Sequence, residues 1–207
     1  MGNLIIARVM ITKKKILSPL IIIHIFIITL SNFFVSIPLE FLKIKITLAA
    51  FIFPLVIVLT DLTVRLLGKD LAQKTIAFSF PFAIISSIII LYIENNPISV
   101  SLRIGFASGI AYVIGILLDI NVFQFIRERY SAWWIAPALS TVLSNVIDSY
   151  TFFFSAFYNS ENMYMSENWV EIAGYQTIIK IIIGIVFFLP VYGILLNILI
   201  KKMIDSN

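Results

Sequence analysis

Residues 104–126 read IGFASGIAYVIGILLDINVFQFI, a run of 23 residues that contains a single charged side chain, Asp119. A helix of this length measures about 34 Å at about 1.5 Å per residue, and the hydrocarbon core of a bilayer is about 30 Å thick. The run is therefore long and apolar enough to cross a membrane as one helix. Asp119 interrupts the apolar pattern, and an ionisable residue inside a membrane span is a candidate functional residue.

Similar apolar runs recur along the whole chain of 207 residues. The composition is 60% hydrophobic and only 13% charged, and the mean hydropathy is +1.04. Soluble domains carry about 25% charged residues. These values exclude a soluble globular protein and indicate that the lipid bilayer is its solvent.

We therefore predict an all-α integral membrane protein, a bundle of six transmembrane helices that forms one domain over residues 1–207. The expected spans cover approximately residues 16–36, 46–65, 76–93, 104–126, 133–158 and 176–200. The second span meets Asp61 after a short uncharged run, and we expect its helix to continue through Arg65. The two side chains would then form an i,i+4 ion pair at the membrane boundary.

The distribution of basic residues predicts the orientation of the bundle. With the N-terminus inside the cell, eleven of the fifteen Lys and Arg residues fall on the cytoplasmic side. The positive-inside rule then favours cytoplasmic N- and C-termini and a multi-pass protein of the bacterial inner membrane. Glu161, Glu167 and Glu171 fall in the longest outer loop of this topology.

Several classes of chemistry are excluded by what the sequence lacks. It has no cysteine and one histidine, so thiolate nucleophiles, iron–sulfur clusters and His-rich metal centres are excluded. It also has no nucleotide-binding P-loop, no HExxH zinc motif and no GxSxG motif. We expect no enzymatic activity, no metal, no cofactor and no nucleic-acid partner, and a solute transporter fits best.

The candidate site residues are polar or aromatic side chains at helical spacing on spans four, five and six. A continuous polar stripe inside a bundle lines a cavity or a path. The candidate substrate-binding residues are Ser108, Tyr112, Asp119, Thr141, Asn145, Asp148, Phe152 and Lys180. Gly105 and Gly109 form a GxxxG motif that allows close approach of another helix, within one protomer or in a homo-oligomer.

Structural roles stay open for several of these residues. Asp148 is alternatively a structural residue that forms an ion pair with Lys180 or Arg103. Asp119 is alternatively the ion-pair partner of Arg127. Asn145 alternatively forms a structural hydrogen bond between helices. His24 is interpreted as a packed, hydrogen-bonded side chain in span one, in preference to a proton relay.

Five blocks in order along the chain resemble the queuosine precursor transporters of the vitamin uptake transporter family. The blocks are SN at 31–32 with Pro38, FP at 53–54 with TDLTVRLLG at 60–68, AYVIGILLDINVF at 111–123, WWIAP at 133–137 leading to Asn145, Asp148 and FFF at 152–154, and FFLPVYGILLN at 187–197. The resemblance implies uptake of 7-cyano-7-deazaguanine, 7-aminomethyl-7-deazaguanine or queuine for salvage into tRNA. The family carries Gln where this chain has Ile116, which leaves the preferred precursor open.

The chemistry of a 7-deazaguanine agrees with this resemblance. Its ring N–H and exocyclic amine form a donor pair that one carboxylate, such as Asp148, accepts, and its carbonyl accepts from an amide such as Asn145. Tyr112 or Phe152 would stack on the flat ring. Two alternatives remain: a substrate-binding membrane subunit driven by a separate ATPase, and a membrane enzyme or structural subunit. Proton transport by Asp119 or Asp148 together with the substrate is a further hypothesis, against facilitated diffusion.

Overall fold

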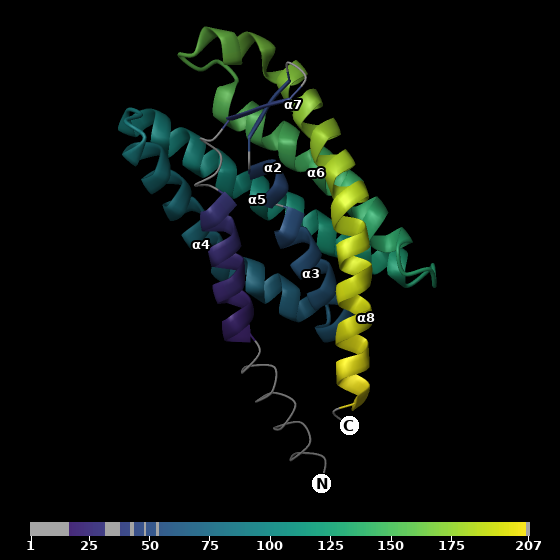
Figure 1. The fold of residues 1–207 in the computed structure, drawn as a ribbon. Helices are drawn as coiled ribbons and strands as arrows, with labels where there is room; N and C mark the ends of the chain where they lie inside the picture. Colours follow the sequence, from purple (N-terminus) through teal and green to yellow (C-terminus); the bar gives the residue numbers. More distant parts are fainter. Residues whose placement is uncertain (1–16, 32–37, 42–43, 48, 53, 206–207) are drawn as a thin grey trace.

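The computed structural model describes residues 17–31, 38–41, 44–47, 49–52 and 54–205. This part of the chain is a bundle of helices, as expected, with one short hairpin (Figure 1). A first helix, Leu17–Ser31, is followed by β1 (Pro38–Phe41), β2 (Ile44–Thr47), α2 (Ala49–Ile52), α3 (Pro54–Leu67), α4 (Lys69–Ile93), α5 (Ile98–Arg127), α6 (Ile135–Phe157), α7 (Met163–Ile183), the π-helical segment η1 (Gly184–Phe188) and α8 (Leu189–Asp205).

The hairpin departs from the all-α prediction. Strands β1 and β2 pair antiparallel, with Pro38 opposite Thr47 and Phe41 opposite Ile44. The expected second span, 46–65, included the end of this hairpin. Its helix instead starts after β2 and is divided into α2 and α3, and α3 begins at Pro54, where a proline is compatible with the first helical turn.

Local sequence explains where the long helices begin and end. Gly68 adopts φ 100, and its N–H donates to the carbonyls of Thr63 and Val64, so the chain turns from α3 into α4. Pro97 precedes α5, and the Asn162 side chain accepts from the N–H of Met165 to cap α7. These caps place the two long helices α4 and α5 side by side (Figure 1).

The helix that contains the sixth predicted span is longer than that span. The helix that contains it is continuous from Met163 to Lys201, so Glu167 and Glu171 lie on α7 and not in a loop. Its π-turn directly precedes Pro190, which has no N–H to donate to the carbonyl four residues earlier. This widened turn is thus a physical consequence of the proline.

Three helices of the described part are long and apolar enough to cross a membrane: α4, α5 and the continuous helix Met163–Lys201. Helix Leu17–Ser31 is apolar but shorter, α3 has 14 residues, and polar side chains reduce the hydropathy of α6. The start of Leu17–Ser31 and the end of α8 lie at the same end of the bundle (Figure 1).

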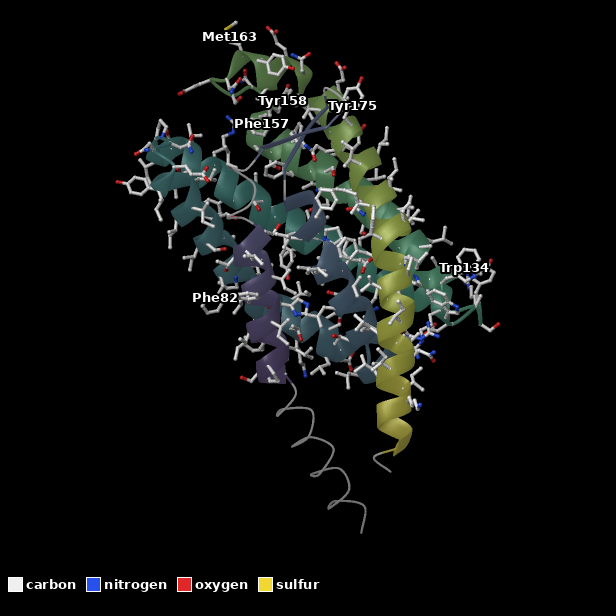
Figure 2. All side chains as sticks on the ribbon, viewed as in Figure 1. Phe82, Trp134, Phe157, Tyr158, Met163 and Tyr175 are labelled. Atoms are coloured by element: carbon white, nitrogen blue, oxygen red, sulfur yellow. The ribbon has the colours of Figure 1, made fainter. Side chains whose placement is uncertain are left out.

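The distribution of side chains is the inverse of that in a soluble protein. Large apolar side chains such as Phe78, Phe82 and Ile89 of α4 are more than half exposed, and Phe82 projects away from the bundle (Figure 2). Asp61, Asp119 and other polar side chains are buried instead. Apolar outer faces around a polar interior are expected where lipid replaces water, so the chain is a membrane protein.

Candidate functional site

The candidate site lies where α5 crosses α6. Glycine at position 115 permits this crossing, because a Cβ there would lie 2.9 Å from the Cβ of Asp148. Gly105 and Gly109 of the same helix play the equivalent role toward α4, where they pack against Ile88 and Ile84. The GxxxG motif is thus used within one protomer, and α5 is packed closely on two sides.

The polar stripe predicted on α6 is buried in the bundle. Ser140, Ser144, Asn145 and Asp148 are at most 7% exposed, and Thr141 is 8% exposed. Their spacing of three and four residues places them on one helical face. Toward the end of α6 the buried face continues through Ser149, Phe153 and Ala156.

A small pocket separates this stripe from α3 and α5. It is lined by Ile57, Gly115, Ile116, Ser144, Asn145 and Asp148, and it is too narrow to admit a water molecule. Ile116, the position at which the sequence departs from the resembling family, is 1% exposed and faces the same space as Asn145 and Asp148. A substitution at this position therefore acts directly on the pocket.

Asp148 is ion-paired with Lys180 of α7. The Lys180 Nζ atom donates to Asp148 Oδ2 at 2.8 Å and to Ser149 Oγ at 3.3 Å. This is one of the two partners that the sequence left open for Asp148. The other, Arg103, donates to the backbone carbonyls of Ser155, Tyr158 and Asn159.

One of the two polar side-chain atoms of Asn145 makes a hydrogen bond within the described part of the chain, and the other does not. Its Nδ2 atom donates to the carbonyl of Thr141 at 2.8 Å, but its Oδ1 atom is buried without a partner among the described residues. A buried acceptor without a partner costs about 1–3 kcal/mol, so such atoms mark strain or a ligand site. The one described hydrogen bond of Asn145 stays within α6 and does not reach another helix.

A second polar cluster joins Asp61 of α3 to Asp119 of α5. Asp61 is 1% exposed and Asp119 is 0% exposed, and their carboxyl groups interact directly. Ser144 Oγ donates to Asp119 Oδ1 at 3.4 Å. One oxygen of each carboxyl group, Asp61 Oδ1 and Asp119 Oδ2, has no hydrogen-bond partner in the part of the chain that is described.

The boundary ion pair predicted between Asp61 and Arg65 is wrong. The helix continues through both residues, as expected, but Asp61 faces the core while Arg65 donates to the carbonyl of Trp133 and to the Tyr192 hydroxyl. Within the described ranges the only ion pair is the one between Lys180 and Asp148. The inward direction of Asp61 follows from its place on the buried face of α3.

Arg127, proposed as a partner of Asp119, also bonds elsewhere, because it donates to the carbonyl of Val64 at 3.3 Å. His24 fits its interpretation as a packed side chain. It is 1% exposed, its Nδ1 atom bonds the carbonyl of Leu20, and its Nε2 atom lies 3.3 Å from Thr60 Oγ1.

The remaining predicted residues lie around the pocket without lining it. Ser108 accepts from Ser87 of α4 at 3.4 Å and thus faces α4. Tyr112 is 3% exposed, and no described residue bonds its hydroxyl. Phe152 packs edge-on against Phe153 of its own helix. 

Thr141 lines a different pocket, together with Asp61, Tyr192 and the π-turn.

Sequence reasoning missed Ile57, Ser140 and the inward position of Asp61. A usable signal was present for Asp61, because it lies at helical spacing from three apolar residues. These residues are Pro54, Ile57 and Val58, which precede it by seven, four and three positions. That spacing places the carboxylate on the apolar face of α3 that packs into the core. Ser140 and Ile57 carry no distinctive local signal.

Comparison with known proteins identifies related transporters. The chain is 40% identical to the "Queuosine precursor transporter" of Escherichia coli (strain K12), over 94% of this chain and 93% of that protein. It is 36% identical to the "Probable queuosine precursor transporter" of Haemophilus influenzae (strain ATCC 51907 / DSM 11121 / KW20 / Rd), over 92% of this chain and 91% of that protein. No solved structure gives a significant match.

The family profile described as "Putative vitamin uptake transporter" matches residues 47–195, which include α3 to α7 and both polar clusters. This match and the two relatives extend over the elements that form the candidate site. The chain belongs to the vitamin uptake transporter family.

Proposed function

We propose that this protein is a multi-pass transporter of the bacterial cytoplasmic membrane that imports a 7-deazaguanine precursor of queuosine. The observation that carries the proposal is the 40% identity to a queuosine precursor transporter over nearly the whole chain. The buried carboxylate and amide of α6 supply the chemistry that such a ligand requires.

The proposed binding residues are Asp148 and Asn145, on one face of α6. Lys180 occupies Asp148 Oδ2, which leaves Oδ1 as the acceptor for a substrate N–H. The unpartnered Oδ1 of Asn145 is a second acceptor, and the second hydrogen on its Nδ2 is a donor for the substrate carbonyl. Bidentate binding by Asp148 would require Lys180 to move away.

This arrangement favours guanine-like edges over adenine. An adenine edge would place an acceptor opposite the two acceptors of the site. In a dry site these unpaired groups make adenine bind much more weakly than a guanine-like ligand. Because the pocket in this structure is closed, binding requires α3 to separate from the crossing of α5 and α6. A closed pocket is expected for one state of a transporter that alternates between open and occluded forms.

The six-span topology is part of the proposal. The start of helix Leu17–Ser31 and the end of α8 at one end of the bundle support an even number of crossings (Figure 1). Trp134 lies beside the start of α6, and Phe157, Tyr158 and Met163 lie at or beyond the other end of this helix (Figure 2). Aromatic side chains at both ends fit two membrane interfaces, and the basic residues favour cytoplasmic termini.

Thermal stability of the purified, detergent-solubilised protein tests the substrate class. The panel is 7-cyano-7-deazaguanine, 7-aminomethyl-7-deazaguanine, queuine, guanine and adenine. A ligand present at 100 times its Kd stabilises the folded state by about 2.7 kcal/mol, which raises the melting temperature by several degrees. We expect the increase with one or more queuosine precursors and not with adenine.

The matched control is Asp70→Asn, which removes an exposed carboxylate from α4 and should respond like the unmodified protein. The absence of an increase with all three precursors, in protein that unfolds cooperatively, would contradict the proposal.

A further inference from the structure

The carboxyl pair of Asp61 and Asp119 lies outside the proposed binding pocket and has no assigned role. Each side chain is at least 99% buried, and the two interact with each other. Neither forms an ion pair within the part of the chain that the structure describes, in contrast to Asp148 with Lys180. Two like-charged groups in contact therefore lie in the apolar interior of a membrane protein.

Two ionised carboxylates in contact are costly in a low-dielectric interior, because their repulsion adds to the loss of hydration. One proton removes one of the two charges and supplies the hydrogen for a carboxyl–carboxylate hydrogen bond. This is the usual solution where two buried carboxyl groups share a site. The hydroxyls of Ser140 and of Ser144, the latter at 3.4 Å, are uncharged and do not balance two negative charges.

Among the described residues, the charged side chains near the pair form their hydrogen bonds elsewhere. On α8, the Tyr192 hydroxyl faces Asp61. The Arg65 guanidinium donates to this hydroxyl and to the Trp133 carbonyl. Arg127 on α5 bonds the α3 backbone. His24, on the first described helix, bonds Thr60 and does not reach the pair.

On α6, the side chains facing the carboxyl pair are the uncharged hydroxyls of Ser140 and Ser144.

A pocket reaches Asp61, one of the two carboxyl groups. It is lined by Asp61 and Thr141, the π-turn residues Gly184 and Phe188, and Tyr192, so it lies between α3, α6 and the α7–α8 helix. Gly184 allows this close approach, since a Cβ there would lie 2.8 Å from the Thr141 side chain. The widened π-turn thus borders a route to Asp61 that is separate from the Asp148 pocket.

Ser144 connects the pair with the proposed binding site. Its hydroxyl donates to Asp119, and the same residue lines the pocket that contains Asn145 and Asp148. One side chain thus contacts both the pair and the binding pocket. Coupling between two sites requires such a shared element that both sites bias.

We propose that Asp61 and Asp119 together form a proton-binding site whose proton moves inward with the transported solute. One carboxylate takes up one proton from the outer side, which changes the charge of the pair from −2 to −1, and releases it to the cytoplasm in the other state. The coupling to solute rests on the proposed function, whereas the proton site itself does not.

A metal ion fits the pair less well than a proton. Hard cations in proteins take about six oxygen ligands, and here two carboxyl groups and two hydroxyls reach that number only if every one of their oxygens binds the ion. Groups of three or more His, Asp or Glu residues that could hold a metal do not occur among the described residues. Direct interaction of the two carboxyl groups is what a shared proton produces.

The first test measures the proton without any solute. Infrared absorption of the unmodified protein in detergent reports the C=O stretch of a protonated carboxyl group, identified by its shift in deuterated water. We expect this band at mildly acidic pH and its loss at alkaline pH. It should persist in Asp148→Asn and disappear in the double variant Asp61→Asn/Asp119→Asn. The absence of the band from the unmodified protein, or its persistence in the double variant, would overturn the proton site.

The second test measures coupling in proteoliposomes with labelled 7-cyano-7-deazaguanine. With acid outside, the unmodified protein and Asp70→Asn should accumulate solute above equilibrium. Asp61→Asn and Asp119→Asn should both lose this accumulation by at least tenfold, and Asp61→Asn should still exchange labelled for unlabelled solute. The exchange shows that this variant is folded and binds solute.

Three results contradict the coupling. The first is equal uptake by the unmodified protein with and without the pH gradient, and the second is gradient-driven accumulation by both variants. The third is accumulation driven by a sodium gradient, which would reassign the site to a metal ion. Failure of the unmodified protein to bind any precursor would contradict the proposed function, and the infrared result would still decide the proton site.

Discussion

Replacement of Asp148 by Asn separates the binding role of this residue from its structural role. The change keeps the size of the side chain and removes the charge that Lys180 Nζ meets at 2.8 Å. If Asp148 Oδ1 accepts from the substrate, affinity should decrease by the value of a charge-assisted hydrogen bond, about 1.5–3 kcal/mol. This corresponds to an increase in Kd of about 10- to 150-fold.

The same substitution should also destabilise the protein, because it leaves the Lys180 ammonium without a counterion. The side chains of Lys180 and Asp148 are 17% and 9% exposed. Breaking a fully buried pair costs about 3–5 kcal/mol and losing an exposed pair about 0–1 kcal/mol, so we expect about 2–4 kcal/mol here. In a chain of this length, that lowers the melting temperature by roughly 5–15 °C.

The double variant Asp148→Asn/Lys180→Met distinguishes the two effects. It contains no unpaired ammonium, so most of the lost stability should return, whereas the affinity for 7-cyano-7-deazaguanine should stay low. Lys180→Met alone is the reverse control: it should lose stability but bind within a few-fold of the unmodified protein, because Asp148 still offers its acceptor.

The assays for this set are thermal unfolding in detergent and equilibrium binding of the labelled precursor. Unchanged affinity in Asp148→Asn would refute the binding role and leave Asp148 as the structural partner of Lys180. Recovery of affinity in the double variant would refute it equally, because binding would then depend on the unpaired ammonium.

Two further predictions concern packing and buried hydrogen bonds. Gly115→Ala places a Cβ 2.9 Å from the Cβ of Asp148 and should cost about 1–3 kcal/mol of stability in a melting assay. The control Gly174→Ala, whose Cβ would lie 3.5 Å from its nearest neighbour, should cost less than half as much. Thr60→Val leaves the buried Nε2 atom of His24 without its partner and should cost about 1–3 kcal/mol. Thr75→Val, which loses a bond within its own helix only, should cost less, and equal losses would contradict the role of His24.

The parts of the fold that the sequence predicted well depend on local patterns. The apolar run at 104–126 lies within α5, and the polar spacing at 141–148 gave the buried face of α6. Boundaries were predicted less well, since hydropathy marks where a helix is apolar and not where it is capped. Asn162 starts α7 well before the apolar run, and Pro54 starts α3 after the run has begun.

The candidate site was harder to predict, because its contacts join residues far apart in sequence. Arg65, four residues after Asp61, offered a plausible local partner, and the helical spacing favoured that pair. The structure shows that burial decides otherwise, because the core face of α3 carries Asp61 toward Asp119 while Arg65 points to α6 and α8. No local pattern indicates a contact of this kind.

Buried polar atoms that have no partner among the described residues link these observations to transport. Asn145 Oδ1, Asp61 Oδ1 and Asp119 Oδ2 lie on three helices that meet near Ser144. A static membrane protein would satisfy such atoms, because each costs about 1–3 kcal/mol in a dry interior. A transporter gains from leaving them free in one state, since solute and proton then offset the cost on binding and bias the bundle toward the occupied form.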